Sequence, residues 1–242
     1  MSKSHLDRIA TDYHTGAKAP DMHIEDLCQE YCGRWILDAL GAADRVLEMG
    51  FGEGNITRSL IASGRHVTTI EGARVLYDKL VAEFGSSITA AHSLFEDYRP
   101  DRPFDAVVAS HVLEHVDDPV ALLKHMRGWI APGGRLIVVV PNKESLHRRL
   151  AVIMGLQPAL DTLGARDKLV GHQRVYSLAT LEHDLRSGGF EVVESTGFFL
   201  KPVANSMMLG YSAELLAAMN EISPQLPKEL LANIGVVATM AD

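Results

Sequence analysis

An apolar run ends in three closely spaced glycines at Val46-Leu47-Glu48-Met49-Gly50-Phe51-Gly52-Glu53-Gly54. The apolar part predicts a buried β-strand, and the pattern from Asn55 onward predicts a helix directly after it. Because glycine lacks a Cβ, such a turn can be tight, and a ligand can approach the backbone N–H groups at the start of the helix. The stretch therefore predicts a nucleotide-like site between a strand and a helix.

The alternation of a short apolar run with a helical pattern recurs along the chain. Strands are predicted at residues 45–49, 66–71, 88–91, 105–110, 135–140, 190–200 and 234–240. Helices are predicted from residue 55, at 73–84, at 119–130 and at 177–187, and a turn at 131–134 leads into the fifth strand. Alternation of this kind predicts an α/β fold with a Rossmann-like, doubly wound and mostly parallel seven-stranded sheet.

Three segments lie outside this pattern. Residues 24–40 predict an amphipathic N-terminal helix against the sheet edge, and the polar residues 6–23 before it are interpreted either as a lid or as a mobile terminus. Residues 142–176 predict a helical insertion after the fifth strand, with helical pieces near 146–154 and 159–169, and 213–232 is a further helical stretch. We expect a single domain, 1–242, in which 1–40 forms the lid and helix and 142–176 the substrate side.

The composition fits one globular domain, with 47% hydrophobic and 22% charged residues among 242. The formal net charge of -8 disfavours a nucleic-acid partner, and the triplet His147-Arg148-Arg149 is interpreted as a solvated helix face. Cys28 and Cys32 match neither a zinc site nor a disulfide framework and are expected to be small buried side chains. No membrane partner and a cytoplasmic location are expected, because a spanning segment and a signal-peptide core are absent from the sequence. The sequence leaves the oligomeric state open and allows a homodimer.

Two acidic residues in the predicted strands are candidate ligand contacts. Glu48 lies two residues before Gly50, where a carboxylate can hold a ligand ammonium group. Glu71 ends the second strand, where an acid can accept from both hydroxyls of a ribose. The glycine spacing differs from the dinucleotide fingerprint G-x-G-x-x-G, because Asn55 stands where the third glycine would be. A nicotinamide oxidoreductase is therefore disfavoured.

The successive motifs resemble those of the class I S-adenosylmethionine-dependent methyltransferases from about residue 36 to residue 142. The resemblance rests on E-x-G-x-G-x-G at 48–54, Glu71, Ser110-His111-Val112-Leu113-Glu114-His115-Val116 and Pro132-Gly133-Gly134. It implies S-adenosylmethionine as the cofactor. Its implied contacts are Glu48, Gly50 and Gly52 at the methionine end, Glu71 with Gly72 at the ribose, Ser93-Leu94-Phe95 at the adenine, and Ser110 with His111 beneath the sulfonium. Phe95 equally fits a core aromatic.

The resemblance implies methyl transfer to an O or N atom of a small polar acceptor, such as a sugar, phenol or heterocycle in specialised metabolism. In-line displacement requires aligned reactants and an acceptor freed of its proton, and histidine is the natural base near neutral pH. His111 and His115 follow the fourth strand, and His172 ends the insertion, so these three are the predicted catalytic residues. Substrate binding is predicted for His172, Arg174 and Tyr176. His115 equally fits a structural role in its turn.

Two alternatives remain open. His111, Glu114, His115 and His172 would form a metal site if their turn is helical, and nitrogen and oxygen ligands suit zinc or another divalent ion. This set is similar to those of small-RNA 2′-O-methyltransferases and metal-using ubiquinone-pathway O-methyltransferases, but His111 replaces the first glutamate; the main prediction has no metal. The second alternative is a non-catalytic S-adenosylmethionine-binding regulatory protein, which the histidines disfavour.

Overall fold

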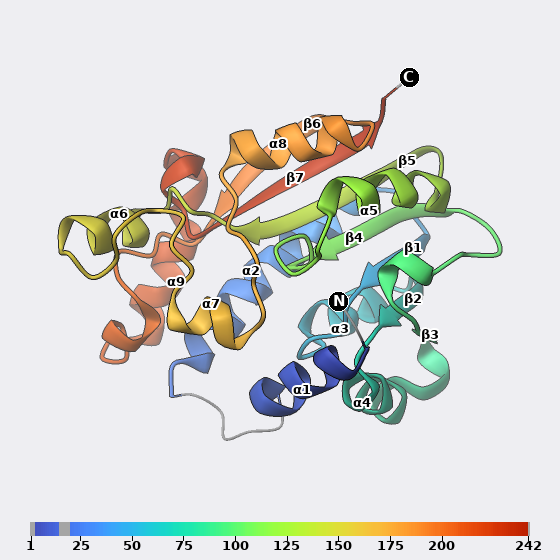
Figure 1. Cartoon of the computed structure of the whole chain (residues 1–242), viewed down its shortest axis with the longest axis horizontal. Helices are drawn as coiled ribbons and strands as arrows, with labels where there is room; N and C mark the ends of the chain where they lie inside the picture. The colour runs from blue at the N-terminus through green and yellow to red at the C-terminus, as the bar shows by residue number, and fades with distance from the viewer. Residues whose placement is uncertain (1–2, 15–19, 242) are drawn as a thin grey trace.

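A single seven-stranded sheet with helices on both faces forms the molecule in the computed structural model, which describes residues 3–14 and 20–241 (Figure 1). The strands are β1 (Arg45–Met49), β2 (His66–Glu71), β3 (Thr89–His92), β4 (Phe104–Ser110), β5 (Ile130–Pro141), β6 (Phe190–Phe198) and β7 (Asn233–Met240). Their order in the sheet is β3-β2-β1-β4-β5-β7-β6, and β7 runs antiparallel to both of its neighbours. The predicted doubly wound, mostly parallel sheet is confirmed.

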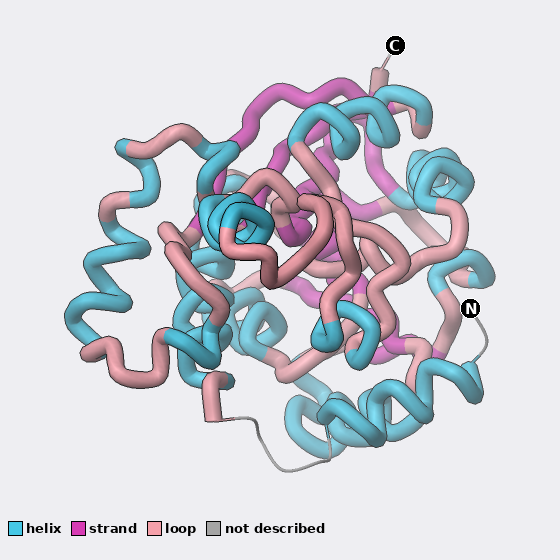
Figure 2. Tube along the Cα trace, turned by 60° about the vertical axis from the view of Figure 1, so that its left-hand side comes forward, coloured by secondary structure: helices cyan, strands magenta, loops and turns pink. Residues whose placement is uncertain are grey.

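Helices cover the sheet from both sides, and in the turned view of Figure 2 the strands lie between them. The α-helices are α1 (Lys3–His14), α2 (Met22–Leu40), α3 (Asn55–Ala62), α4 (Arg74–Phe84), α5 (Pro119–Met126), α6 (Leu146–Ile153), α7 (Ala165–Leu169), α8 (Leu178–Ser187) and α9 (Ala213–Glu221). One apolar cluster packs α5 and α8 against the central strands, and a second packs α2, α3 and α9 against the opposite face. This packing on both faces of the sheet fixes the positions of the carboxyl ends of β1 and β4.

The strand β5 begins earlier than predicted. Residues 131–134 belong to the strand rather than to a separate turn, because Ile130 already pairs with Phe104 and a register shift follows before the next pair. A Cβ at Gly134 would lie 2.8 Å from the carbonyl oxygen of Asp105, closer than such contacts normally come. The glycine therefore allows the irregular start of β5 to lie directly against β4.

The remaining differences lie in the less regular segments. Residues 3–14 form the helix α1, where the polar sequence predicted no helix. The predicted helices at 159–169 and 213–232 are shorter, as α7 and α9. Strand β6 ends at Phe198 because Phe199 has a φ of 62°, a left-handed conformation that breaks an extended strand. Contacts with other parts of the fold, rather than the local sequence pattern, determine where these helices and this strand begin and end.

Two predictions about short groups of residues have opposite outcomes. Cys28 and Cys32 are buried free thiols on α2, as expected. The triplet at 147–149 is not a solvated face, because Arg148 is only 8% exposed.

None of the described helices combines the length and apolarity required to cross a bilayer.

Candidate active site

The glycine turn between β1 and α3 leaves open space beside its backbone. Gly50 and Gly52 have φ values of 78° and 51°, and a Cβ built on either meets no atom of the described chain within 4 Å. Gly54 differs, because its Cβ would lie 2.7 Å from Phe51 Cε2. The first two glycines therefore leave room for a ligand, whereas the third allows Phe51 to pack closely beneath the start of α3.

Glu71 is fixed beside this turn by backbone amides. Its Oε2 accepts from the N–H of Phe51 at 3.0 Å, and its Oε1 accepts from the N–H of Ala73 at 2.7 Å. The carboxylate at the end of β2 is thus oriented by the loop that follows β1 as well as by its own loop. A Cβ at the neighbouring Gly72 would lie 2.7 Å from Leu6 Cδ1, so α1 contacts this edge directly. Ribose binding by Glu71 and Gly72 stays a prediction.

Glu48 lies behind the glycine turn. Its two carboxylate oxygens accept from the hydroxyl of Thr57 at 2.8 and 3.0 Å, and one also accepts from Thr69 at 2.9 Å. Burial raises the pKa of Glu48 to about 7, partly opposed by these hydroxyl donors. The side chain joins α3 to β2 beneath the turn, and its predicted contact with a ligand ammonium group stays a prediction.

The residues predicted for the adenine and for the sulfonium lie at the same edge of the sheet. The Ser93 N–H donates to the Glu71 carbonyl oxygen at 3.2 Å, which holds the end of β3 beside the end of β2. Leu94 lies next to Gly72, and the partly buried Phe95 packs against the core. Ser110 is half-buried at the last position of β4.

A buried acid, Glu114, lies at the centre of the loop after β4. It is 0% exposed, and its Oε1 lies 3.2 Å from Nδ1 of His111. Burial opposes charge on both groups, but the hydrogen bond and the mutual attraction lower the pKa of Glu114 and raise the pKa of His111. His111, held with a φ of 56°, is therefore paired with Glu114, and its raised pKa favours the form that already carries the proton.

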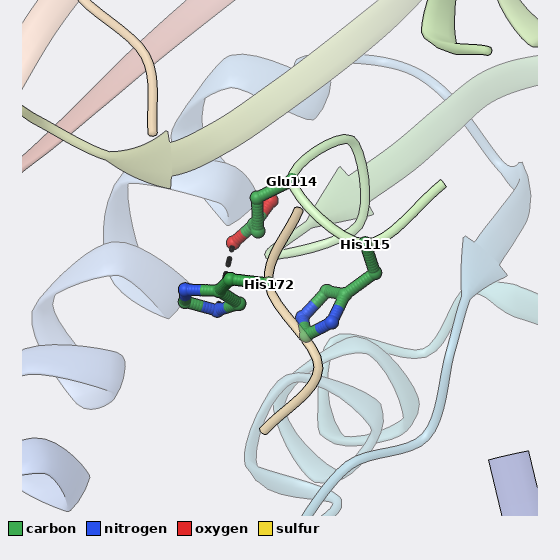
Figure 3. A group of neighbouring side chains, drawn as sticks. All are labelled: Glu114, His115 and His172. Carbon is green, nitrogen blue, oxygen red and sulfur yellow. Dashed lines mark ion pairs between the residues drawn. The ribbon is translucent and has the colours of Figure 1, made fainter. Parts of the chain in front are cut away.

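His115 and His172 complete the cluster, coming from opposite sides of it (Figure 3). Their rings meet edge to face with centroids 4.7 Å apart, and His172 Nε2 lies 4.0 Å from Glu114 Oε1. Burial lowers the pKa of His115 to about 4, so this ring is neutral near pH 7. The structure thus brings all three histidines predicted as catalytic together around Glu114.

The same cluster contains three groups with the spacing of metal ligands. One atom from each of Glu114, His115 and His172 lies within 4.8 Å of the other two. The residues 113–115 form a hydrogen-bonded turn rather than the helix on which the prediction depended. Among the described residues, His111 is not part of this three-residue group.

Arg174 and Tyr176 are engaged by the protein itself. The Arg174 guanidinium donates to the carbonyl oxygens of Leu113 at 3.0 Å and Asp117 at 3.2 Å, and also to that of Val116. Tyr176 is 2% exposed, and its hydroxyl donates to Asp184 at 3.0 Å. Arg174 therefore holds the loop of residues 111–117 after β4, here called the histidine loop, and Tyr176 packs in the core. Substrate contact by either stays a prediction.

Sequence reasoning missed Asp167. Its Oδ1 lies 3.0 Å from Nδ1 of His172, on the side of the ring away from Glu114. An acid on a short helix in an irregular insertion carries no periodic signal, and its only sequence clue is its position five residues before His172.

Comparisons with known proteins identify the family and the fold of the chain. A family model described as "Methyltransferase domain" matches residues 24–195. The chain is 26% identical over 211 residues to a ubiquinone biosynthesis O-methyltransferase of Aeromonas salmonicida, covering 79% of this chain and 82% of that protein. It is 29% identical over 188 residues to a protein of the same name from Xylella fastidiosa, covering 76% and 75%. The solved CcbJ methyltransferase from Streptomyces caelestis shares the fold, with a TM-score of 0.63 at 16% identity over 98% of this chain and 97% of that one.

Proposed function

Because the chain belongs to the class I S-adenosylmethionine-dependent methyltransferases, we propose that it methylates a hydroxyl oxygen of a small acceptor, with His172 taking up the hydroxyl proton. One observation carries the proposal. The open glycine turn follows β1, the histidine loop follows β4, and these two strands are neighbours in the sheet. Ligands of open α/β sheets bind outside the carboxyl ends of such strands.

The residues at the glycine turn fit the cofactor. Two glycines with free space beside them permit close approach of an adenosyl amino acid, and Glu71 lies where an acid can accept from ribose hydroxyls. When bound, S-adenosylmethionine supplies a methyl group on a sulfonium sulfur, which keeps the electron pair of the broken bond when the acceptor oxygen bonds to the methyl carbon. The chain contributes alignment and exclusion of water, worth on the order of 7 kcal/mol or more.

Of the three histidines, His172 suits proton uptake best. The raised pKa of His111 beside Glu114 favours a ring that already holds its proton, and the pKa of His115, about 4, makes it a weak base. His172 comes from the insertion, and its Nε2 faces the loop after β4. In the proposed reaction the acceptor O–H proton moves to Nε2 of His172 as the new C–O bond forms, leaving a methyl ether and the demethylated cofactor.

The relatives favour oxygen over nitrogen as the methyl acceptor. Both curated proteins described above are named O-methyltransferases. Their names refer to ubiquinone biosynthesis, which gives no support to the expected role in specialised metabolism. Among the acceptor classes expected from the sequence, we propose a hydroxyl-bearing one, a phenol or a sugar.

Cofactor binding provides the first test. We expect calorimetry to detect binding of S-adenosylmethionine and of its demethylated product, and Gly52→Val to weaken it at least a hundredfold, because a β-branched side chain at a φ of 51° is strained and fills the open space. Gly64→Val is the matched control, since Gly64 has a φ of 78° and equally open surroundings but lies in the turn after α3. Equal affinity in wild type and Gly52→Val would refute the proposed cofactor site.

Transfer of a radiolabelled methyl group to a panel of phenols, sugars and heterocyclic amines then tests the acceptor class. We expect product from hydroxyl-bearing compounds. Methylation confined to amines would contradict the proposed oxygen acceptor without affecting the cofactor site.

A second candidate is metal-assisted O-methylation, which the spacing of Glu114, His115 and His172 favours. Glu114 Oε2 is buried and has no hydrogen-bond partner among the described residues, so it has a free position for a ligand. A divalent ion held by these residues would lower the pKa of an acceptor hydroxyl. Stoichiometric metal in the purified protein, with activity lost on chelation and restored by the ion, would favour this candidate. Full activity after complete chelation would exclude it.

A further inference from the structure

The insertion is organised around the buried side chain of Arg148. Its Nη1 donates to the carbonyl oxygens of Leu160 at 3.3 Å and Thr162 at 2.9 Å, and its Nη2 donates to Asp167 Oδ2 at 2.8 Å. The guanidinium is a permanent cation in proteins, so the pair with Asp167 is an ion pair. Its two side chains are only 10% and 15% exposed. Arg148 thus fixes Asp167 while it also closes the loop between α6 and α7.

Asp167 in turn holds His172 at two points. The backbone N–H of His172 donates to the Asp167 carbonyl oxygen at 2.8 Å, and its ring Nδ1 lies 3.0 Å from Asp167 Oδ1. The N–H of Gly164 donates to Asp167 Oδ2 at 2.9 Å. The ion pair with Arg148 and the N–H of Gly164 both favour the ionised form of the Asp167 carboxylate. An ionised carboxylate only accepts, so Nδ1 of His172 must carry the hydrogen.

The position of the ring follows from these contacts. With Nδ1 donating to Asp167, the neutral imidazole has its lone pair on Nε2, which lies 4.0 Å from Glu114 Oε1. The edge-to-face contact with His115 restrains the ring from the side (Figure 3). Nε2 is therefore directed to the loop at the carboxyl end of β4, which adjoins the strand bearing the glycine turn.

We propose that Asp167, held by Arg148, is a positioning residue that fixes His172 in the Nδ1–H tautomer and so presents Nε2 to the methyl acceptor. The inference rests on the proposed function for its catalytic consequence, although the tautomer itself does not depend on that function. The Asp167 charge also stabilises the imidazolium that forms when Nε2 takes up the acceptor proton.

Asp167→Asn tests the proposal with two readouts. Asparagine keeps the shape and can still bond to Arg148 through its oxygen, but it can present an amide N–H to His172 and reverse the tautomer. With an acceptor found in the panel, we expect kcat to fall about a hundredfold or more, while the KM for the cofactor changes less than threefold. The control is Asp105→Asn, because the Asp105 carboxylate likewise accepts from the backbone, from the N–H groups of Asp44 at 3.1 Å and Arg45 at 2.8 Å, but at the opposite edge of the sheet.

The second readout is ¹⁵N NMR of the His172 ring in the cofactor-free protein, assigned by comparison with His172→Gln. We expect a protonated Nδ1 and an unprotonated Nε2 in wild type, and the reverse in Asp167→Asn. An Nε2–H tautomer in wild type would overturn the proposal, even if the variant fails to fold. An unchanged tautomer and kcat in Asp167→Asn would do the same. Absence of methyl transfer by wild type, with the expected tautomer observed, would count against the proposed function and not against Asp167.

Discussion

The two sides of the site are built in different ways. On the proposed cofactor side, the glycine turn after β1 and Glu71 after β2 are positioned by backbone conformation and backbone hydrogen bonds. On the proposed acceptor side, the insertion at residues 142–176 is held together by the buried side chains of Arg148, Asp167 and His172. A site fixed by the main chain tolerates side-chain changes around it. A site fixed by a chain of ionic contacts depends on each member.

Replacement of Arg148 is expected to have the largest effect on one side of the site alone. Arg148→Met leaves Asp167 buried without its cation, and the loss of one partner of a buried ion pair typically costs about 3–5 kcal/mol. We expect residues 154–172 to exchange their amide hydrogens at least tenfold faster, with cofactor affinity changed less than threefold. Hydrogen exchange followed by mass spectrometry, together with calorimetry, measures both effects.

Arg149→Met is the matched control for this experiment. Arg149 is the exposed neighbour of Arg148 on the same helix, and its guanidinium bonds only to the carbonyl oxygen of Glu144 at 2.5 Å among the described contacts. We expect normal exchange in the insertion of this variant. Equal loss of protection in both variants, or loss of cofactor binding in Arg148→Met alone, would contradict the division into two separately supported sides.

The same contrast explains what the sequence made predictable. The mostly parallel sheet, its strands and the location of the glycine turn follow from hydrophobic periodicity and from glycine spacing, which are local signals. Arg148 and Asp167 lie 19 positions apart and meet only because the insertion folds back on itself. A basic triplet indicates a solvated face on average, and nothing local to Arg148 signals its buried partners. The placement of His111 and His115 at the carboxyl edge of the sheet was predictable, because both lie in the loop after a predicted strand.

The helix α1 was missed for a related reason. Its apolar residues are few, and a short helix of this kind is unstable alone in water. It forms against Phe51, Ala73 and the buried face of α4, with Leu6 and Ala10 in the contact. Such stability comes from residues more than forty positions away, which periodicity within the segment does not show.

On the cofactor side, Glu48 offers a test that depends on pH. Burial raises the pKa of Glu48 in the folded protein from 4.5 to about 7, so the folded chain retains a proton that the unfolded chain has released between these values. Stability should therefore fall as the pH rises from about 4.5 to 7, by at most about 3 kcal/mol. We expect thermal melts of cofactor-free Glu48→Gln to lack this decline, since Gln stays neutral and can still accept from Thr57 and Thr69.

Glu30→Gln provides the control for the pH series, because Glu30 is an exposed carboxylate on α2. Its melts should follow the wild-type pH dependence. A parallel decline in wild type and Glu48→Gln would show that the buried carboxyl of Glu48 does not carry the proton.

The smallest expected effects concern α1, which touches both sides of the site. A Cβ at Gly72 would lie 2.7 Å from Leu6 Cδ1, and a Cβ at Gly171 would lie 2.7 Å from Ile9 Cδ1. Leu6 therefore packs on the predicted ribose edge, and Ile9 packs on the residue before His172. Each side chain is half-buried, so truncation to alanine removes about 1 kcal/mol of packing, equivalent to about fivefold in affinity.

Leu6→Ala and Ile9→Ala form a matched pair on one helix. We expect Leu6→Ala to weaken cofactor binding up to about fivefold in calorimetry, because it loosens the contact with Gly72, while the KM for the acceptor stays unchanged. Ile9→Ala should do the reverse, raising the acceptor KM and leaving cofactor affinity as in wild type. If both variants changed both quantities equally, α1 would act as one rigid cover, and the two sides of the site would be coupled through it rather than independent.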